Sequence, residues 1–263
     1  MKRKMFAVLA AMVVAVSSVS VAESPMKIVE MTDLLFDAIS KNDTEQAKLA
    51  ISAGANLKST RFDEGLTPLI YAIKNGRADI VEALIKSKAD VNVKNNGSSN
   101  RPPLVWAVSY DEKGKRDRMV EALVKANADL NEADSIGWTP ATLAVNLGHT
   151  NIIDLLIKSG VDINAKDKNG KTLLMHAVYK INVAEMLIKM GADVNAKANN
   201  GYTALMYAAE NHRSGEDMVA LLIKSGADVN AKANNGYTAL KAASDWGGHK
   251  GIVALLKTAG AVE

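Results

Sequence analysis

The sequence of 263 residues contains no cysteine, and only 5% of its residues are aromatic. Without cysteine the chain forms no disulfide, no thiolate metal site and no lipid-modified N-terminal cysteine, so its stability must come from packing. The motifs G-x-S-x-G and H-E-x-x-H and a phosphate-binding loop are also absent. The common signatures of serine hydrolases, zinc peptidases and nucleotide-binding enzymes are therefore lacking.

Net charge is also low once the N-terminus is set apart. The chain has 32 basic and 29 acidic residues, and three of the basic ones are Lys2, Arg3 and Lys4. Residues 23–263 therefore carry 32 − 3 = 29 basic residues against 29 acidic ones. This balance gives no general attraction to phosphate, so we expect no nucleic-acid binding.

The first 22 residues differ in kind from the rest. The three basic residues precede an apolar run from Met5 to Val16, and small residues follow up to Ala22. This pattern predicts a secretory signal peptide that is cleaved after Ala22. An uncleaved anchor is the alternative, but the run is shorter than the roughly 20 residues that span a bilayer. We expect no membrane insertion after cleavage, and a periplasmic or secreted protein.

An internal repeat is the most informative pattern that is present. The fifteen residues from Gly191 to Leu205, GADVNAKANNGYTAL, recur letter for letter from Gly226 to Leu240. Weaker copies extend toward the N-terminus, and the period of about 33 residues predicts seven units that stack on their neighbours. The period is measured between the alanines that close equivalent blocks: Ala38, Ala72, Ala107, Ala144, Ala177, Ala208 and Ala243.

Each unit contains signals for two helices. Thr67-Pro68 and Thr139-Pro140 place a capping hydroxyl before a proline, which predicts helix starts. Lys88 and Asn127 stand where other units have a glycine that ends the second helix, and a left-handed lysine costs about 1 kcal/mol. The glycines in this position are Gly54, Gly160, Gly191, Gly226 and Gly260.

Between the helix pairs the sequence predicts hairpins. Asn-Gly pairs favour tight two-residue turns, and short V-N-A segments before them favour extended backbone. The pairs are Asn169-Gly170, Asn200-Gly201 and Asn235-Gly236.

In the order T-P-L-x-x-A, G-H, apolar helix, G-A-D-V-N-A and N-G, the sequence resembles the ankyrin repeat family over about residues 31 to 261. The resemblance implies a mainly α fold, an ankyrin-repeat solenoid of about seven helix pairs with hairpin-like loops. We expect a short segment over residues 23–30 and one repeat domain over 31–263. Lys241 and Lys257 replace apolar residues of earlier units, which predicts a polar last repeat.

The histidines and the D-x-N motifs give no catalytic or metal site. His149 and His249 occupy the G-H pair and His176 lies one place after the family's usual histidine, so we interpret them, and the loop residue His212, as structural. Asp193-Val194-Asn195 resembles the start of a calcium loop, but Lys197 and Ala204 stand where oxygen ligands are needed. We expect no metal, no cofactor and no enzymatic activity.

What remains is a surface for a protein partner. The resemblance implies that the residue between the turn glycine and the capping threonine, and residues shortly after the alanine block, face the concave side. Tryptophan and tyrosine are enriched in binding hot spots. The alternative is that each ring packs on its neighbouring loop, and Tyr71, Trp106 and Tyr207 are expected to be buried between helices. The expected partner-binding residues are Leu66, Tyr110, Trp138, Lys171, Tyr179, Tyr202, Tyr237 and Trp246.

Two units have insertions between their helices, within Tyr110 to Arg118 and around Asn211 to Gly215. We expect the charged first insertion to be a solvated loop. The leading hypothesis is an exported, monomeric scaffold that binds a folded protein of unknown identity through its concave surface. The alternatives are a secreted effector that binds a host protein, and an enzyme with an unrecognised site.

Overall fold

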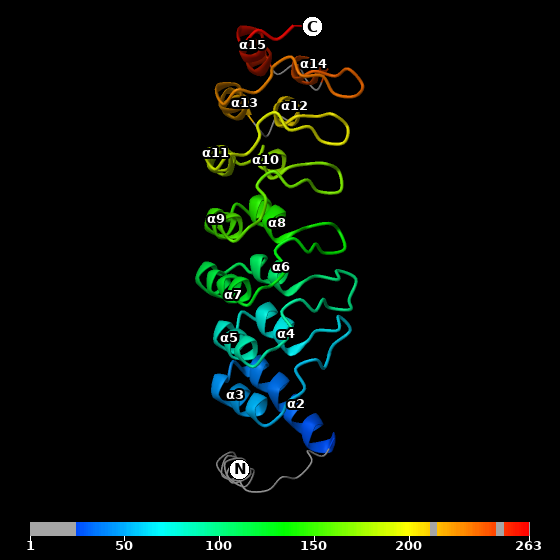
Figure 1. Cartoon of the computed structure of the whole chain (residues 1–263), viewed down its shortest axis with the longest axis vertical. Helices are drawn as coiled ribbons and strands as arrows, with labels where there is room; N and C mark the ends of the chain where they lie inside the picture. The colour runs from blue at the N-terminus through cyan, green and yellow to red at the C-terminus, as the bar shows by residue number, and fades with distance from the viewer. Residues whose placement is uncertain (1–24, 211–214, 246–249, 263) are drawn as a thin grey trace. The chain divides into compact units, whose positions relative to one another are not determined.

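The computed structural model describes residues 25–210, 215–245 and 250–262 (Figure 1). The predicted signal peptide, most of the second insertion, His212, His249 and Trp246 lie outside these ranges. The chain divides into two compact units, with the boundary between Asn127 and Ala128.

Unit 1 consists of three helix pairs in two layers. The first helices α2, α4 and α6 contact one another, and so do the second helices α3, α5 and α7. Each pair is joined by a short turn, and each second helix also packs on the first helix of its pair. The helices are α2 (Pro25–Lys41), α3 (Thr44–Ser52), α4 (Pro68–Lys74), α5 (Ala78–Lys86), α6 (Pro103–Val108) and α7 (Lys113–Lys125).

Unit 2 repeats this arrangement with four pairs. The first helices follow one another in contact, and loops before them project to one side (Figure 1). We call these loops fingers, with residues 128–139, 161–172, 192–203 and 227–238. The helices are α8 (Pro140–Leu147), α9 (Thr150–Lys158), α10 (Leu173–His176), α11 (Ile181–Lys189), α12 (Ala204–Glu210), α13 (Gly215–Lys224), α14 (Ala239–Asp245) and α15 (Lys250–Thr258).

The described residues thus form the seven helix pairs that the repeat predicts. One boundary differs from expectation, because α2 already begins at Pro25. Residues 25–30 are therefore part of the first helix and not a separate segment before the repeats. In the last repeat Lys241 is exposed, whereas its counterpart Met206 is fully buried.

Apolar side chains between the two layers form the core. Ile80 and Leu84 of α5 have no exposed surface, and the same is true of Leu205 and Met206 of α12. Ile80 and Leu84 are four positions apart and therefore lie on the same face of α5. Leu205 and Met206 are adjacent at the start of α12. Burial of a side chain of this size contributes about 1.5–3 kcal/mol.

The caps of the helices confirm the start and stop signals. The Thr67 hydroxyl accepts a hydrogen bond from the Ile70 N–H at 3.3 Å, and Thr139 does the same for Thr142 at 3.2 Å. Gly160 and Gly191 have positive φ angles of 110° and 97° after their helices. Lys88 adopts the same left-handed region, with φ 62°.

Replacing Lys88 by glycine is expected to stabilise unit 1 by about 1 kcal/mol, because it removes the Cβ clash of a left-handed lysine. Urea denaturation of the full chain, followed by far-UV circular dichroism, measures the change. Lys86→Gly is the matched control, since Lys86 is the last helical residue of α5. That substitution should destabilise the protein; a loss of stability in both variants would contradict the strain at Lys88.

The fingers differ from the predicted two-residue hairpins. In the third finger of unit 2 the Gly201 N–H donates to the Ala198 carbonyl at 2.9 Å, and Gly201 has φ 81°. A type I′ turn needs positive φ at both central residues, but Asn200 has none. The turn is therefore four residues long with glycine last, and Val194 and Asn195 lie in a turn. No strand occurs in the described ranges.

Hydrogen bonds from one finger to the next take the place of a sheet. Asn195 donates from Nδ2 to the Gly226 carbonyl at 3.0 Å and accepts the Asp228 N–H at Oδ1 at 2.8 Å. Within the motif, Asp193 Oδ1 accepts the Asn195 N–H at 2.8 Å. The D-x-N motif is thus a turn, as expected, and its asparagine also links consecutive repeats of unit 2.

The charged insertion in unit 1 is helical and not a solvated loop. Its residues extend α7 to 13 residues, compared with 9 in α5. Arg116 within it is only 4% exposed, and its Nη1 donates to the Tyr110 carbonyl at 3.3 Å. Arg118, two positions later, pairs at 2.8 Å with Asp79 and Glu82 of α5. The expectation of a loop is wrong because these arginines find partners when the helix is extended.

Candidate protein-binding surface

Unit 2 brings three tyrosines from two consecutive repeats into contact. The ring centroid of Tyr202 lies 5.1 Å from that of Tyr207, and 6.4 Å from that of Tyr237 with only 14° between the planes. All three side chains are partly exposed. We call Tyr202, Tyr207 and Tyr237 the tyrosine cluster.

The repeat places these rings. Tyr202 and Tyr237 occupy the same position between the finger glycine and the capping threonine, one repeat apart. Because stacked repeats bring equivalent residues side by side, the two rings lie almost parallel. Tyr207 comes from the first helix α12, five residues after Tyr202, and completes the cluster from the helical side.

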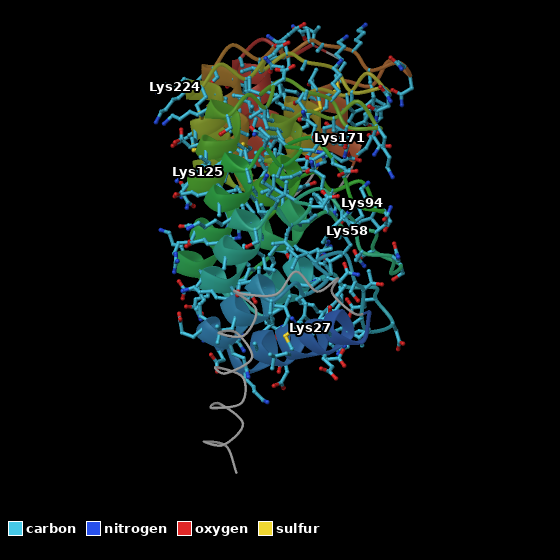
Figure 2. All side chains as sticks on the ribbon, turned by 60° about the horizontal axis from the view of Figure 1, so that its bottom comes forward. Lys27, Lys58, Lys94, Lys125, Lys171 and Lys224 are labelled. Carbon is cyan, nitrogen blue, oxygen red and sulfur yellow. The ribbon has the colours of Figure 1, made fainter. Side chains whose placement is uncertain are left out.

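Two lysines flank the cluster, one from the preceding repeat and one from the last repeat, to which Tyr237 also belongs. The Lys171 Nζ lies 4.1 Å from the centre of the Tyr207 ring, and the Lys241 Nζ lies 6.0 Å from that of Tyr237. These distances are typical of cation–π contacts. Figure 2 shows Lys171 on the finger side and Lys224, at the end of α13, on the opposite side. The finger side of unit 2 therefore presents aromatic rings together with positive charge.

Hydrogen bonding and burial keep the phenols of the cluster protonated. The Tyr237 hydroxyl donates to Asp245 Oδ2 at 2.6 Å, and this bond, with burial and the charge of Asp245, raises the pKa of Tyr237 to about 12. Burial and the charge of Glu210 also raise the pKa of Tyr202 and of Tyr207. Near neutral pH the three rings are therefore uncharged.

A pocket of about 550 Å³ opens beside the cluster. Its walls combine two aromatic rings, three carboxamides and one carboxylate. The volume is sufficient for one large side chain of a partner. The lining residues are Asn200, Tyr202, Tyr207, Glu210, Asn234 and Asn235.

The preceding repeats of unit 2 add a hydrogen-bonded histidine and aspartate beside a tryptophan. His176 Nε2 lies 3.0 Å from Asp167 Oδ2, and the His176 ring centroid lies 6.1 Å from that of Trp138. Burial lowers the pKa of His176, although its bond to Asp167 acts in the opposite direction. Burial raises the pKa of Asp167, but bonds from the N–H groups of Lys171 and Asn169 and from His176 outweigh it and lower the pKa.

These shifts predict that acid destabilises unit 2 in two steps. The folded pKa of His176 lies below its ordinary 6.5, so the unfolded chain binds the proton first. The contribution of His176 to the free energy of unfolding is fully present above pH 6.5, and it is lost as the pH falls toward the pKa of the folded state. The folded pKa of Asp167 lies below its ordinary 3.8, so a second loss follows below that pH.

Thermal denaturation between about pH 8 and about pH 5 measures the first step. His176→Gln keeps a polar side chain that does not titrate, and it should flatten the dependence of the melting temperature on pH over this window. An unchanged slope in the variant would show that His176 does not carry the effect.

The two predicted binding residues of unit 1, Leu66 and Tyr110, are not fully exposed. Leu66 is only 2% exposed, so its side chain lies in the core and the expectation of an exposed contact at Leu66 is corrected. Tyr110 is half-buried, and its ring fills the space that a Cβ at Gly76 would need. The ring thus packs on the turn between α4 and α5, and contact of Tyr110 with a partner stays a prediction. Its backbone carbonyl also accepts the bond from Arg116.

The residues expected to be buried between helices are instead partly exposed. Tyr71 contacts Phe62 with centroids 4.8 Å apart, and Trp106 lies under Lys74 and Arg101 at 5.4 Å and 4.9 Å. Tyr207 belongs to the tyrosine cluster. All three rings belong to first helices and are partly exposed, so they are not enclosed between the helices.

The remaining predicted residues have mixed positions. Tyr179 is 52% exposed, at the turn between α10 and α11. Trp246 lies outside the described residues. Sequence reasoning missed Asp167, Glu210 and Asn234. Asp167 had one available signal, since an acidic residue stands there where the later, identical copies have Ala198 and Ala233.

The described residues offer no arrangement for metal chemistry, because no group of three or more histidine, aspartate or glutamate side chains among them could hold an ion. Among the same residues, every helix is too short or too polar to cross a bilayer.

Comparison with known proteins matches this architecture. The family model described as ankyrin repeats (3 copies) matches residues 35–134, 104–198 and 193–262. The crystal structure of the ankyrin repeat domain of Bcl-3, a member of the IkappaB protein family, has a TM-score of 0.73. Its identity is 24%, and the match covers 85% of this chain and 97% of the Bcl-3 chain. At this identity the likeness establishes the fold alone.

Curated relatives match over shorter stretches. Neurogenic locus notch homolog protein 1 of Xenopus laevis is 34% identical over 130 residues, which cover 47% of this chain and 5% of the relative. The human transient receptor potential cation channel subfamily A member 1 is 32% identical over 115 residues, 44% of this chain and 10% of the relative. The match thus spans a small part of these proteins. Ankyrin repeats are typically non-catalytic scaffolds for protein–protein interaction. With its repeats matched from residue 35 to residue 262, the chain belongs to the ankyrin repeat family.

Proposed function

We propose that this protein is a non-catalytic scaffold that binds a folded protein partner through the finger side of unit 2. The observation that carries the proposal is the series of partly exposed rings along successive repeats, Trp138, His176 and the tyrosine cluster. Buried apolar residues explain the stability of the repeats without these rings. Partly exposed tyrosine and tryptophan side chains in contact with one another are typical of binding hot spots.

Site-specific crosslinking in the native cell tests the proposal. A photo-crosslinking amino acid at position 202 should give a discrete crosslinked product, because Tyr202 lies at the centre of the cluster. The matched control carries the same amino acid at Lys224, which is exposed on the opposite side (Figure 2). Equal yields at the two positions would contradict a binding surface on the finger side.

The triple variant Trp138→Ala, Tyr202→Ala and Tyr237→Ala provides a second measurement. With the crosslinker placed at Lys171, between the altered positions, the variant should lose the product while its helical circular dichroism stays the same. Retention of the product in a folded variant would remove these three rings from the interface.

We also propose that the protein acts outside the cytoplasm. The support is the sequence pattern of residues 1–22, which predicts cleavage after Ala22. Cell fractionation with N-terminal sequencing of the mature protein tests this, and a mature chain that begins at Met1 would contradict it. Protein in the periplasm favours a scaffold for a cellular partner, whereas protein in the culture medium favours an effector that binds a host protein.

A further inference from the structure

We propose that the pocket beside Tyr202 binds an arginine side chain of the partner protein. This inference rests on the proposed function and specifies the chemistry of the partner at that surface. It is argued from the shape of the pocket, from its charge, and from the cations that the chain already places on its own rings.

The pocket has the groups that a guanidinium requires. Tyr202 and Tyr207 line the pocket, and a flat cation that enters it can contact their rings. Asn234 contributes a carboxamide oxygen and Glu210 a carboxylate, whereas the oxygens of Asn200 and Asn235 already accept the N–H groups of Tyr202 and Tyr237. A guanidinium carries five N–H donors in a plane, so it can stack and donate at the same time, which the compact ammonium of lysine does less well.

The charge of the pocket favours a cation. Glu210 is the one charged residue among its lining residues, and it forms no ion pair within the described residues. The other carboxylates nearby are engaged, since Asp167 binds His176 and Asp245 binds Tyr237. The raised pKa values of Tyr202 and Tyr207 mean that these phenols stay uncharged and add no competing charge of their own. Glu210 therefore supplies the negative charge with which an incoming positive side chain would pair.

Two rings of the tyrosine cluster already contact lysines of the chain itself. Lys171 lies over Tyr207 and Lys241 lies over Tyr237, so the two outer rings of the cluster already contact cations. Neither lysine lines the pocket. Of the cations in the described ranges, none lies over the central ring, Tyr202. A cation over Tyr202 would lie between these two lysines, so the carboxylate of Glu210 has to offset their positive charge.

Nuclear magnetic resonance titration of the mature chain with short capped peptides tests the proposal. The peptides share glycine and serine flanks and differ in a central pair, Arg-Arg, Lys-Lys, Leu-Leu or Glu-Glu. We expect the Arg-Arg peptide to shift the amide signals of Gly201, Glu210 and Asn234, and to bind about tenfold more tightly than the Leu-Leu peptide. The Lys-Lys peptide should bind less tightly than the Arg-Arg peptide.

Variants assign the effect to the pocket. Glu210→Gln and Tyr202→Ala should each weaken the binding of the Arg-Arg peptide about tenfold, whereas Tyr202→Phe keeps the ring and should retain it. Glu185→Gln removes the same charge from α11, which belongs to the second-helix layer, and should leave binding unchanged. Thermal denaturation confirms that each variant is folded.

The outcomes separate this inference from the proposed function. Equal binding of the Leu-Leu or Glu-Glu peptide, or unchanged binding by Glu210→Gln, overturns the arginine pocket. If crosslinking at position 202 still gives a protein partner, the scaffold function stands without it. If crosslinking also fails, both proposals are rejected.

Discussion

Gly201→Ala is expected to destabilise the protein by about 3 kcal/mol, because two costs add at this position. The residue has φ 81°, a conformation that alanine adopts only with strain. A Cβ at Gly201 would also lie 2.6 Å from the backbone nitrogen of Asn234 and 3.0 Å from the carbonyl carbon of Ala233. Both atoms belong to the backbone of the next finger, so the finger itself must shift.

Gly236→Ala is the control that separates these costs. Gly236 occupies the same place in the identical fifteen-residue copy and has φ 77°, but an added Cβ there meets nothing within 4 Å. It should cost about 1 kcal/mol from the backbone strain alone. Urea denaturation of the two full-length variants gives the difference. Equal losses at the two glycines would show that the next finger accommodates the added Cβ without a further cost.

Arg116→Ala is expected to cost about 3 kcal/mol, although the residue belongs to a highly charged stretch. The side chain is almost fully buried, its Nε lies 3.4 Å from Asp117 Oδ1, and its Nη1 holds the Tyr110 carbonyl. Removal of the guanidinium leaves the partly buried Tyr110 carbonyl without its donor. It also removes the positive charge beside Asp117, whose buried Oδ1 accepts no hydrogen bond among the described residues.

Arg118→Ala, two residues along the same helix, is the matched comparison. Arg118 forms ion pairs with two carboxylates, those of Asp79 and Glu82, but its side chain is 49% exposed. The exchange should therefore cost at most about 1 kcal/mol. Added salt should reduce the small effect at Arg118 and leave the large effect at Arg116 nearly unchanged. Similar losses in the two variants would refute the distinction between the buried and the exposed ion pair.

These pairs show what the sequence could and could not predict. Periodic alanines, Thr-Pro caps and left-handed C-terminal residues are local signals, and each led to the correct helix boundary or backbone conformation. Even the left-handed Lys88 was predicted, because its slot was defined by glycines in the other units. Because the same local signals recur in every unit of a repeat, together they identify the fold even where each one is weak.

Contacts between repeats were predicted less well, because they depend on which atoms meet across the stack. The Asn-Gly pairs suggested a two-residue turn, but the bonds between fingers favour a longer one. Arg116 and Arg118 look alike in the sequence, and only the extended α7 distinguishes a buried arginine from an exposed one.

For the candidate surface, position in the repeat identified Tyr202 and Tyr237 but not their partners. Tyr207 was predicted to be buried because it directly precedes Ala208, the alanine that defines the repeat period. Ala208 is fully buried, but the Tyr207 side chain is partly exposed. Glu210 and Asn234 had no distinguishing signal, since acidic residues and asparagines are common at helix ends and turns. Their role depends on the pocket that consecutive repeats form together.

The bonds of Asn195 to the following finger have an evolutionary consequence. Its two partners are the backbone groups of Gly226 and Asp228, which begin the next identical copy. Tandem duplication of residues 191–225 would give the new copy a matching acceptor and donor at once, with no compensating substitution. Duplication can therefore lengthen unit 2 by whole repeats, and the identity of residues 191–205 and 226–240 is the record that such an event would leave.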